Sequence, residues 1–269
     1  MTASVAMHVV MESRSLENPA YREMVVRAPG ITGKALPGQF VHVRLPAAGD
    51  ALLRRPFSIS GCDNGDLTLL FKVKGRITRA MALLAPGAGL DVLGPLGQGY
   101  RFPGPVEHAV LAGGGYGAAP LLFLASHLRR KNLAGKVTFL AGARTAAELI
   151  WRDKIAREGW LKAVYATEDG SAGFKGTVVD LCQDLVRREK DGVHLYACGP
   201  MGMLASLCRR LPDVPVQVAV ENQMGCGIGV CMGCVLPVKT TGGAGYARVC
   251  LDGPVFDGAT IDWAACTSG

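Results

Sequence analysis

The sequence predicts an antiparallel β-barrel, then an α/β domain with a parallel sheet, then a small cysteine-containing subdomain. Short apolar runs separated by Gly, Pro and Asn turn residues fill residues 1–102, which is typical of a small barrel. Strand and helix patterns alternate over residues 103–220, which indicates a parallel sheet with crossover helices. A glycine-rich cysteine motif lies within residues 221–269. We expect the domain boundaries to follow residues 102 and 220.

Length and charge limit the classes of function. The 269 residues suggest about two domains that each bury a core. The net charge is +7 without a run of five basic residues, so anionic cofactors or an acidic partner are expected rather than nucleic acid. The first residues lack signal-peptide features, and glycines and a proline interrupt the longest uncharged stretch, residues 109–126. We therefore expect a cytoplasmic protein that does not cross a membrane.

The first functional motif lies within the predicted barrel. The run Arg55-Pro56-Phe57-Ser58 places a cation, a proline with fixed φ, a ring and a hydroxyl on successive residues. Arg55 can pair with a phosphate, and Ser58 can hydrogen-bond the N5 edge of a flavin. This pattern favours a site for a flat, anionic cofactor, and the alternative is an ordinary edge strand with an exposed arginine.

A second segment of the barrel carries glycine and basic residues. Residues 71–78 include Lys72, Lys74 and Gly75, and the pattern predicts a short helix over residues 78–84. Helix N-termini bind pyrophosphate readily. The alternative is a routine N-cap, because a threonine at a helix start also satisfies backbone N–H groups.

The α/β domain begins with a glycine turn. An apolar strand over residues 108–112 leads into Gly113, Gly114, Gly115, Tyr116 and Gly117, and an apolar helix follows to about residue 130. Strand, glycine turn and helix in this order predict a dinucleotide site. The spacing differs from G-x-G-x-x-G, so a tight turn without a ligand is the alternative.

Three further strand and helix pairs complete this domain. We expect strands over residues 137–141, 161–166 and 194–197, followed by helices over residues 146–157, 177–188 and 201–210. Cys198, Gly199 and Pro200 follow the last of these strands. Ligands of open α/β sheets bind at strand ends, so Cys198 is a candidate neighbour of a nicotinamide ring. The alternative is a small buried apolar residue.

The strongest motif contains four cysteines, Cys226, Cys231, Cys234 and Cys250. Their spacing, C-x4-C-x2-C and then a distant cysteine, is that of plant-type two-iron, two-sulfur (2Fe-2S) sites. The intervening glycines allow a tightly curled loop whose N–H groups approach the sulfurs. Tetrahedral zinc and a disulfide framework are the alternatives, but only one C-x2-C pair is present and disulfides are not expected in a reducing compartment.

The remaining cysteines and all histidines lack ligand-like spacing. We interpret the other cysteines as packing or surface thiols, and they are Cys62, Cys182, Cys208 and Cys266, with Cys198 treated above. We assign no role to the histidines, which are His8, His42, His108, His127 and His194.

These motifs in this order resemble the ferredoxin reductase superfamily, and more narrowly the electron-transfer subunits of NAD-dependent dihydroorotate dehydrogenases. The resemblance covers nearly the whole chain. Its most specific part joins residues 221–234 to residues 248–256, because few other families place a cysteine cluster there.

The resemblance implies FAD on the barrel, a 2Fe-2S cluster on the four cysteines, and NAD as the hydride acceptor. The expected FAD residues are Arg55, Pro56, Phe57, Ser58, Lys72, Val73, Lys74, Ile77 and Thr78. The candidate NAD residues are Gly113, Gly114, Gly115, Gly117, Cys198, Gly199 and Pro200. The cluster ligands are Cys226, Cys231, Cys234 and Cys250. The implied units are 1–102 for FAD, 103–220 for NAD(P) and 221–269 for the cluster.

The resemblance also implies a partner. In this family a separate FMN-bearing catalytic subunit oxidises dihydroorotate for pyrimidine biosynthesis, and two copies of each subunit assemble. Electrons then pass through the cluster to FAD and leave as a hydride to NAD, because a flavin links one-electron and two-electron carriers.

Other functions stay open at this point. Similar subunits serve NAD(P)H-linked ferredoxin oxidoreductases and glutamate synthase-like partners. Arg144 is a candidate contact for a nucleotide phosphate, so the choice between NAD and NADP is open. A zinc-stabilised interaction module on a nucleotide-binding scaffold is an alternative from another class. The tail beyond Asp262, with Cys266, carries no usable motif.

Overall fold

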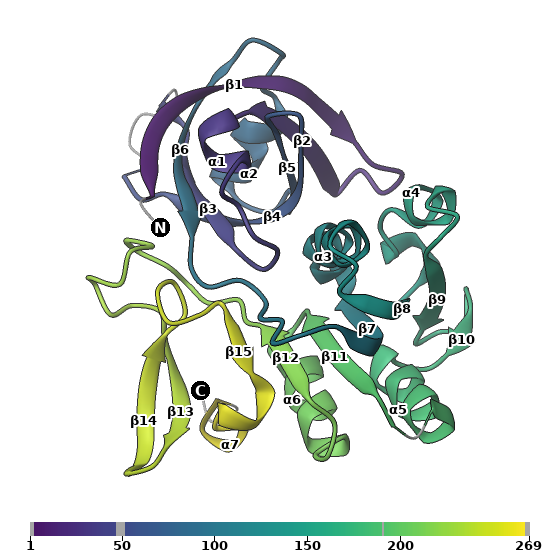
Figure 1. Ribbon diagram of the computed structural model, residues 1–269. Coiled ribbons are helices and arrows are strands. Elements are labelled where there is room, and N and C mark those ends of the chain that lie inside the picture. Colours follow the sequence, from purple (N-terminus) through teal and green to yellow (C-terminus); the bar gives the residue numbers. More distant parts are fainter. Residues whose placement is uncertain (1–2, 47–51, 190, 267–269) are drawn as a thin grey trace.

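The computed structural model describes residues 3–46, 52–189 and 191–266 (Figure 1). Six strands close into a barrel in the order β1-β2-β5-β4-β3-β6 with antiparallel pairing. They are β1 (Ser4–Ser15), β2 (Tyr21–Arg27), β3 (Phe40–Arg44), β4 (Arg55–Asp63), β5 (Asp66–Lys72) and β6 (Gly89–Leu96). Two short helices accompany them, α1 (Pro29–Thr32) and α2 (Arg76–Ala82). Alternate residues such as Leu67 and Leu69 point inward and are fully buried, as the strand period requires.

A seven-stranded sheet follows, in the order β10-β9-β8-β7-β11-β12-β15. Its first six strands are β7 (Val106–Gly114), β8 (Ala134–Ala143), β9 (Lys162–Thr167), β10 (Phe174–Lys175), β11 (Val193–Cys198) and β12 (Val216–Ala219). The helices of this domain are α3 (Ala118–Arg130), α4 (Arg152–Arg157), α5 (Val178–Glu189) and α6 (Met201–Arg210). Helix α3 lies between the barrel and the sheet (Figure 1). Its Phe123 packs into the barrel core, while Leu121 and Leu124 pack toward the sheet.

The single helix expected over residues 146–157 is wrong. The structure has a 3-10 turn, η3 (Ala146–Glu148), and then α4, which begins at Arg152. Leu149, Ile150 and Trp151 between them are all buried, and Trp151 has a φ of 58°. Three consecutive residues cannot share one face of a helix, so burying all of them requires a break.

The C-terminal part returns to the α/β sheet. The hairpin β13 (Val235–Thr240) and β14 (Gly243–Arg248) follows a segment without helix or strand, and then β15 (Val255–Asp257) pairs antiparallel with β12. A 3-10 turn, η4 (Gly258–Thr260), and a short helix, α7 (Trp263–Cys266), follow. The predicted fold class is confirmed, with one antiparallel edge strand added to the sheet. The domain boundaries remain a proposal.

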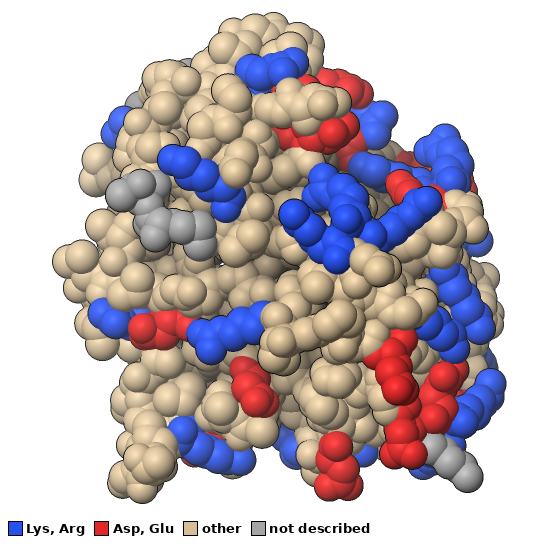
Figure 2. Space-filling view, viewed as in Figure 1, with Lys and Arg blue, Asp and Glu red and all other residues tan. Residues whose placement is uncertain are grey.

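Charge is distributed unevenly over the surface. Figure 2 shows basic side chains gathered over α3 and α4, and acidic side chains near α5. The left side of this view, where the C-terminal cysteine segment meets the barrel, carries fewer charges. Within the described ranges, no helix combines the length and hydropathy needed to span a bilayer.

Candidate functional site

A cavity of about 630 Å³ lies where the barrel, the start of α3 and residues 220–224 meet. Eight of the nine residues expected to hold FAD line it: Arg55, Pro56, Phe57, Ser58, Lys72, Lys74, Ile77 and Thr78. The ninth, Val73, packs against the barrel core. The fold therefore brings the two barrel motifs to one cavity, whose volume is typical of a cofactor site.

The polar lining of the cavity suits an anionic ligand. Four basic side chains line it, those of Arg55, Lys72, Lys74 and Arg76. Ser60 also lines it, and its buried Oγ has no hydrogen-bond partner among the described residues. A buried hydroxyl without a partner is costly unless a ligand or water satisfies it. The cavity residues thus fit a flavin carrying phosphate groups.

Strand pairing positions residues 55–58, which we call the flavin wall. On β4, Phe57 faces the barrel core and packs edge-to-face against Phe71, with ring centroids 5.6 Å apart. Because side chains alternate along a strand, Pro56 and Ser58 face the other side. Nη1 of Arg55 donates to the carbonyl of Leu53 at 2.9 Å. The flavin wall is therefore formed by barrel pairing and local hydrogen bonds.

The second motif contains a capped helix start. Helix α2 begins two residues earlier than expected, and Gly75 is its N-cap. Oγ1 of Thr78 accepts the N–H groups of Lys74 and Gly75, each at 3.0 Å. The N-cap alternative therefore describes these contacts correctly, and a direct role of Thr78 toward FAD stays a prediction.

The glycine turn and the Cys198 loop pack tightly against each other. Strands β7 and β11 are parallel neighbours, with Gly113 opposite Cys198. A Cβ on Gly117 would lie 2.4 Å from the carbonyl oxygen of Cys198, and one on Gly199 would lie 3.1 Å from the backbone of Gly114. Gly117 therefore needs glycine for this close approach, and a side chain at residue 199 would force its neighbours to shift. The predicted NAD residues thus meet at the carboxyl ends of β7 and β11. Of these residues, only Gly117 lines the cavity.

Cys198 is buried, with 2% of its surface exposed. Burial raises the pKa of its thiol well above the usual value, so the group is neutral at physiological pH. Gly115 and Pro200 belong to the same pair of loops. The role of all these residues in binding NAD stays a prediction.

The sequence reasoning missed one whole wall of the cavity. Residues 221–224 line it, together with Tyr116, Pro254 and Phe40. The hydroxyl of Tyr116 donates to Oε2 of Glu221 at 2.8 Å, which joins the glycine turn to this wall. The available signal was position, because these residues immediately precede the first motif cysteine.

Residues 221–234 form the cysteine loop, which contains no helix or strand. Five backbone N–H groups donate to motif sulfurs over 3.1–3.5 Å: those of Ile228 and Cys231 to Cys226, of Gly229 to Cys250, of Gly233 to Cys231, and of Cys250 to Cys234. N–H groups directed at sulfurs stabilise negative charge on a thiolate cluster. The donor set therefore fits an iron–sulfur cluster.

The sulfurs differ in acidity. Burial opposes ionisation of Cys226, but the N–H groups of Ile228 and Cys231 outweigh it and lower the pKa of Cys226 to about 6. Burial and the neighbouring Cys234 raise the pKa of Cys250 to about 12. A bound metal replaces the proton of such a thiol, so uptake of a cluster releases protons.

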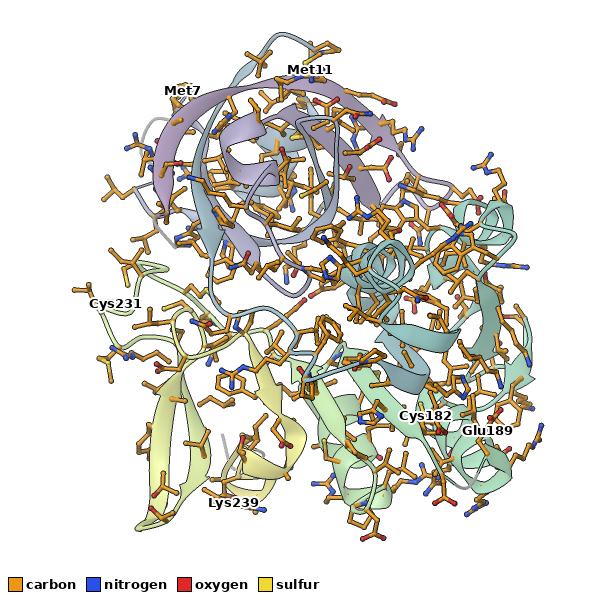
Figure 3. All side chains as sticks on the ribbon, in the orientation of Figure 1. Met7, Met11, Cys182, Glu189, Cys231 and Lys239 are labelled. Carbon is orange, nitrogen blue, oxygen red and sulfur yellow. The ribbon has the colours of Figure 1, made fainter. Side chains whose placement is uncertain are left out.

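A cluster and a single zinc ion make different demands on the four cysteines. Among the described residues, no three histidine, cysteine or acidic side chains surround a single ion position. A 2Fe-2S cluster needs only two cysteines on each iron, whereas structural zinc needs four ligands on one ion. Cys231 lies at the exposed edge of the loop, far from Cys182 in α5 (Figure 3).

Arg144 follows β8 and is engaged by an acidic side chain. Its guanidinium donates to Glu148 through Nη2 at 2.6 Å and Nε at 3.2 Å. Glu148 lies in the loop after the second strand of the α/β domain. In dinucleotide folds an acidic residue in this region accepts a hydrogen bond from a ribose hydroxyl.

Two family models match the chain. One is described as the iron-sulfur cluster binding domain of dihydroorotate dehydrogenase B and matches residues 221–262. The other is described as an oxidoreductase NAD-binding domain and matches residues 111–209. The first range contains the four motif cysteines, and the second contains the glycine turn and Cys198.

Curated relatives carry one name. The electron transfer subunit of dihydroorotate dehydrogenase B (NAD(+)) from Desulforamulus reducens is 39% identical over 240 residues, which cover 88% of this chain and 90% of the relative. The subunit of the same name from Geobacillus kaustophilus is 41% identical over 224 residues, covering 82% and 84%.

Solved structures agree with the fold. A structure of an NADH-dependent reduced ferredoxin-NADP oxidoreductase, concerned with flavin-based electron bifurcation, has a TM-score of 0.83 at 29% identity and covers 97% of this chain and 91% of that chain. A ferredoxin reductase of carbazole 1,9a-dioxygenase has a TM-score of 0.69 at 22% identity, covering 81% and 69%. The second likeness concerns the fold alone.

Proposed function

Because the chain belongs to the electron transfer subunits of NAD-dependent dihydroorotate dehydrogenase B, we propose that it carries electrons between a catalytic partner subunit and NAD. One observation carries this proposal. Residues 221–224 line the cavity, and the next residues of the same segment lead directly to Cys226. The flavin site and the cluster site are therefore neighbours along one stretch of chain.

Each part of the chain has a separate task. A flavin supplies hydride exchange with NAD, and a 2Fe-2S cluster supplies one-electron transfer. Arg55 and Lys74 hold the anionic part of FAD, and Ser58 and Ser60 offer hydroxyls to its polar edge. The four motif cysteines hold the cluster, and the loop N–H groups orient their sulfurs. Gly117 lets the glycine turn pack closely against the Cys198 loop, beside the cavity that the nicotinamide nucleotide would approach.

The surface of the cysteine loop suits docking of a partner. Ile228, Val230 and Met232 are exposed by 48%, 76% and 54% of their surface. Contiguous exposed apolar side chains mark interaction sites. The occupant is the FMN-bearing catalytic subunit, two copies of each subunit assemble, and the complex works in the cytoplasm, where thiolate ligands stay reduced.

The nucleotide preference follows from Glu148. Glu148 pairs with Arg144 at 2.6 Å and would compete with a 2′-phosphate for this arginine. The carboxylate also repels a second anion. NAD is therefore the preferred dinucleotide.

Co-expression with a dihydroorotate-oxidising partner tests this function. The complex is expected to reduce NAD when dihydroorotate is added, whereas the partner alone is not. No dihydroorotate-dependent NAD reduction, combined with NADH-dependent reduction of a ferredoxin, would contradict the assignment and favour a ferredoxin reductase.

A further inference from the structure

His42 lies between the cavity and the cysteine loop. It is on β3 of the barrel and is completely buried. Phe40, two residues earlier on the same face, lines the cavity. The two rings pack edge-to-face, with centroids 6.4 Å apart and an interplanar angle of 78°. A continuous pair of rings therefore extends from the cavity toward the loop.

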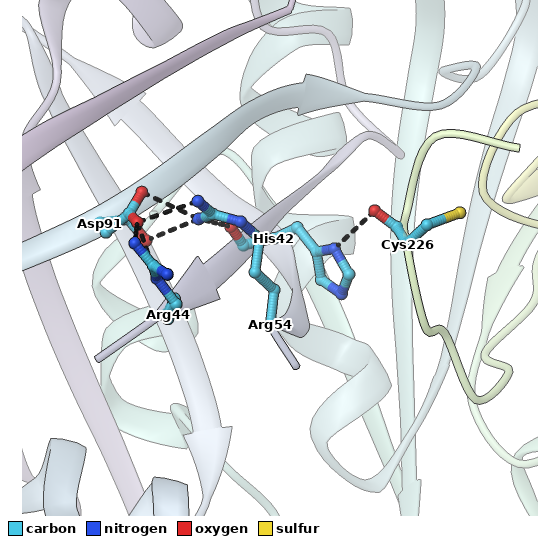
Figure 4. Close-up of polar contacts among 5 residues, drawn as sticks. All are labelled: His42, Arg44, Arg54, Asp91 and Cys226. Atoms are coloured by element: carbon cyan, nitrogen blue, oxygen red, sulfur yellow. Dashed lines mark hydrogen bonds and ion pairs between the residues drawn. The ribbon is translucent and has the colours of Figure 1, made fainter. Parts of the chain in front are cut away.

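His42 bonds directly to a cluster-ligand residue. Its Nδ1 lies 3.3 Å from the carbonyl oxygen of Cys226. A carbonyl only accepts hydrogen bonds, so this contact assigns the proton of the neutral ring to Nδ1. Figure 4 shows the Cys226 carbonyl turned toward His42 and its sulfur on the opposite side. Since the peptide is planar and trans, the N–H of Gly227 points away from His42.

Gly227 fits against the ring. Its φ is +73°, and a Cβ there would lie 2.4 Å from Nδ1 of His42. Only glycine combines this backbone conformation with such a close approach. His42 thus makes two contacts with the loop, a hydrogen bond to the Cys226 carbonyl and close packing against Gly227.

The barrel holds His42 firmly from the other side. Nη1 of Arg54 donates to the carbonyl of His42 at 3.3 Å and to Oδ1 of Asp91 at 2.9 Å. Arg44 also pairs with Asp91, at 2.8 Å (Figure 4). Asp91 is 4% exposed. Two ion pairs on one buried carboxylate restrict the backbone at this point. The anchor for Cys226 is therefore rigid.

The other end of the cluster motif is braced by a separate contact. The backbone N–H of Gln98 donates to the carbonyl of Gly253 at 2.6 Å, and its Nε2 donates to the carbonyl of Leu251 at 3.2 Å. Leu251 follows the ligand Cys250. Gln98 thus holds the Cys250 side, whereas His42 contacts the Cys226 peptide itself. Within the loop, Nη1 of Arg248 also donates to the carbonyl of Gly229 at 3.3 Å.

We propose that His42 is a positioning residue that holds the Cys226 peptide against the flavin-binding barrel. It fixes the separation between the flavin and cluster sites and turns the following N–H groups toward the sulfurs. This inference rests on the proposed function, since it assumes that both cofactors bind. It adds a residue to which the sequence reasoning gave no role.

Three variants of the full chain with its cofactors test the proposal. His42→Phe keeps the ring but loses the donor, His42→Asn places an amide N–H near the Nδ1 position, and His42→Gln places it farther out. We expect His42→Phe to slow reduction of the cluster by NADH-reduced flavin about tenfold, as is usual when an outer partner of a metal ligand is lost. His42→Asn is expected to restore most of the rate, and His42→Gln is not.

The electron paramagnetic resonance (EPR) spectrum of the dithionite-reduced cluster gives a readout independent of NADH. Its g values and midpoint potential are expected to shift in His42→Phe and His42→Gln and to stay near wild type in His42→Asn. His108→Gln is the matched control, because His108 is also buried but bonds Thr138 in the α/β domain. It is expected to change neither the spectrum nor the rate.

A wild-type spectrum, potential and rate in His42→Phe would overturn the proposal. If that variant does not fold, equal behaviour of His42→Asn and His42→Gln would overturn it instead. Failure of the proposed function is distinguishable: NADH then leaves the wild-type flavin oxidised, while the dithionite-reduced spectra still report on His42.

Discussion

The flavin wall and the cysteine loop hold their cofactors by different means. Residues 55–58 lie on β4, which pairs with β3 on one side and, farther along, with β5 on the other. Residues 221–234 have no strand partner, and several of their N–H groups donate to thiol sulfurs. A backbone satisfied by a sheet is formed before a ligand binds, whereas one directed at sulfurs depends on the ligand. Flavin binding therefore uses a preformed surface, whereas cluster binding completes the fold of the cysteine loop.

Cys231→Ser gives the largest expected effect. It tests whether the cluster can be lost while the flavin stays bound. The cluster is expected to be lost completely, because serine oxygen is a poor replacement for a thiolate on iron. Flavin is expected to remain, because the flavin wall belongs to the barrel. Iron content and the visible spectrum of the purified protein measure both. Cys62→Ser in the barrel is the control, and loss of flavin together with iron would show that the two regions form one cooperative unit.

Asp91→Asn tests how much the ion pairs of Asp91 with Arg54 and Arg44 stabilise the barrel beside His42. Burial opposes ionisation of Asp91, but Arg54 and Arg44 outweigh it and hold its pKa below the usual value. Removing the buried charge is expected to lower the free energy of unfolding at neutral pH by about 3 kcal/mol. Chemical denaturation measures this change. Asp184→Asn is the control, because its ion pair with Arg187 is exposed and worth little.

The pH dependence of the stability of Asp91→Asn tests whether the charge of Asp91 causes the expected loss. A carboxyl with a lowered folded-state pKa stabilises the protein above its unfolded pKa of about 3.9, and this contribution is lost as pH falls through the folded pKa. The difference in stability between wild type and Asp91→Asn is therefore expected to narrow below about pH 4. A difference that stays constant on acidification would contradict the ion-pair explanation.

Arg55→Ala gives the smallest expected effect. Loss of one charge-assisted hydrogen bond to phosphate is expected to weaken FAD binding about tenfold. Fluorescence titration of the flavin-depleted protein with FAD measures the affinity. Arg187→Ala, on the exposed face of α5, is the control. Unchanged affinity in Arg55→Ala would remove this residue from the flavin site.

Local patterns in the sequence predict much of this structure. The barrel and the alternating strands and helices follow from short-range periodicity and turn residues, and Arg55 and Ser58, which their motif singles out, line the cavity. The spacing of Cys226, Cys231 and Cys234 predicts one loop, and Cys250 joins it from beyond the β13–β14 hairpin. Each of these inferences depends on residues close together in the chain, where geometry is set locally.

The remaining features depend on distant contacts. His42 and Cys226 are separated by 184 positions, and nothing in the sequence around either residue indicates that they meet. Residues 221–224 become a cavity wall because they follow β12, which pairs with β11 and β15 in the α/β sheet and ends near the barrel. The break at Trp151 likewise comes from burial against the core and overrides local helix preference.

An anaerobic titration with NADH, followed by visible absorption and EPR in one sample, tests the central claim most directly. The claim is that electrons pass between a flavin and a 2Fe-2S cluster held by this one chain. We expect flavin absorbance to bleach and the signal of a reduced two-iron cluster to appear, with iron and flavin both bound. A colourless protein that contains zinc and does not react with NADH would contradict the account and identify a binding module instead.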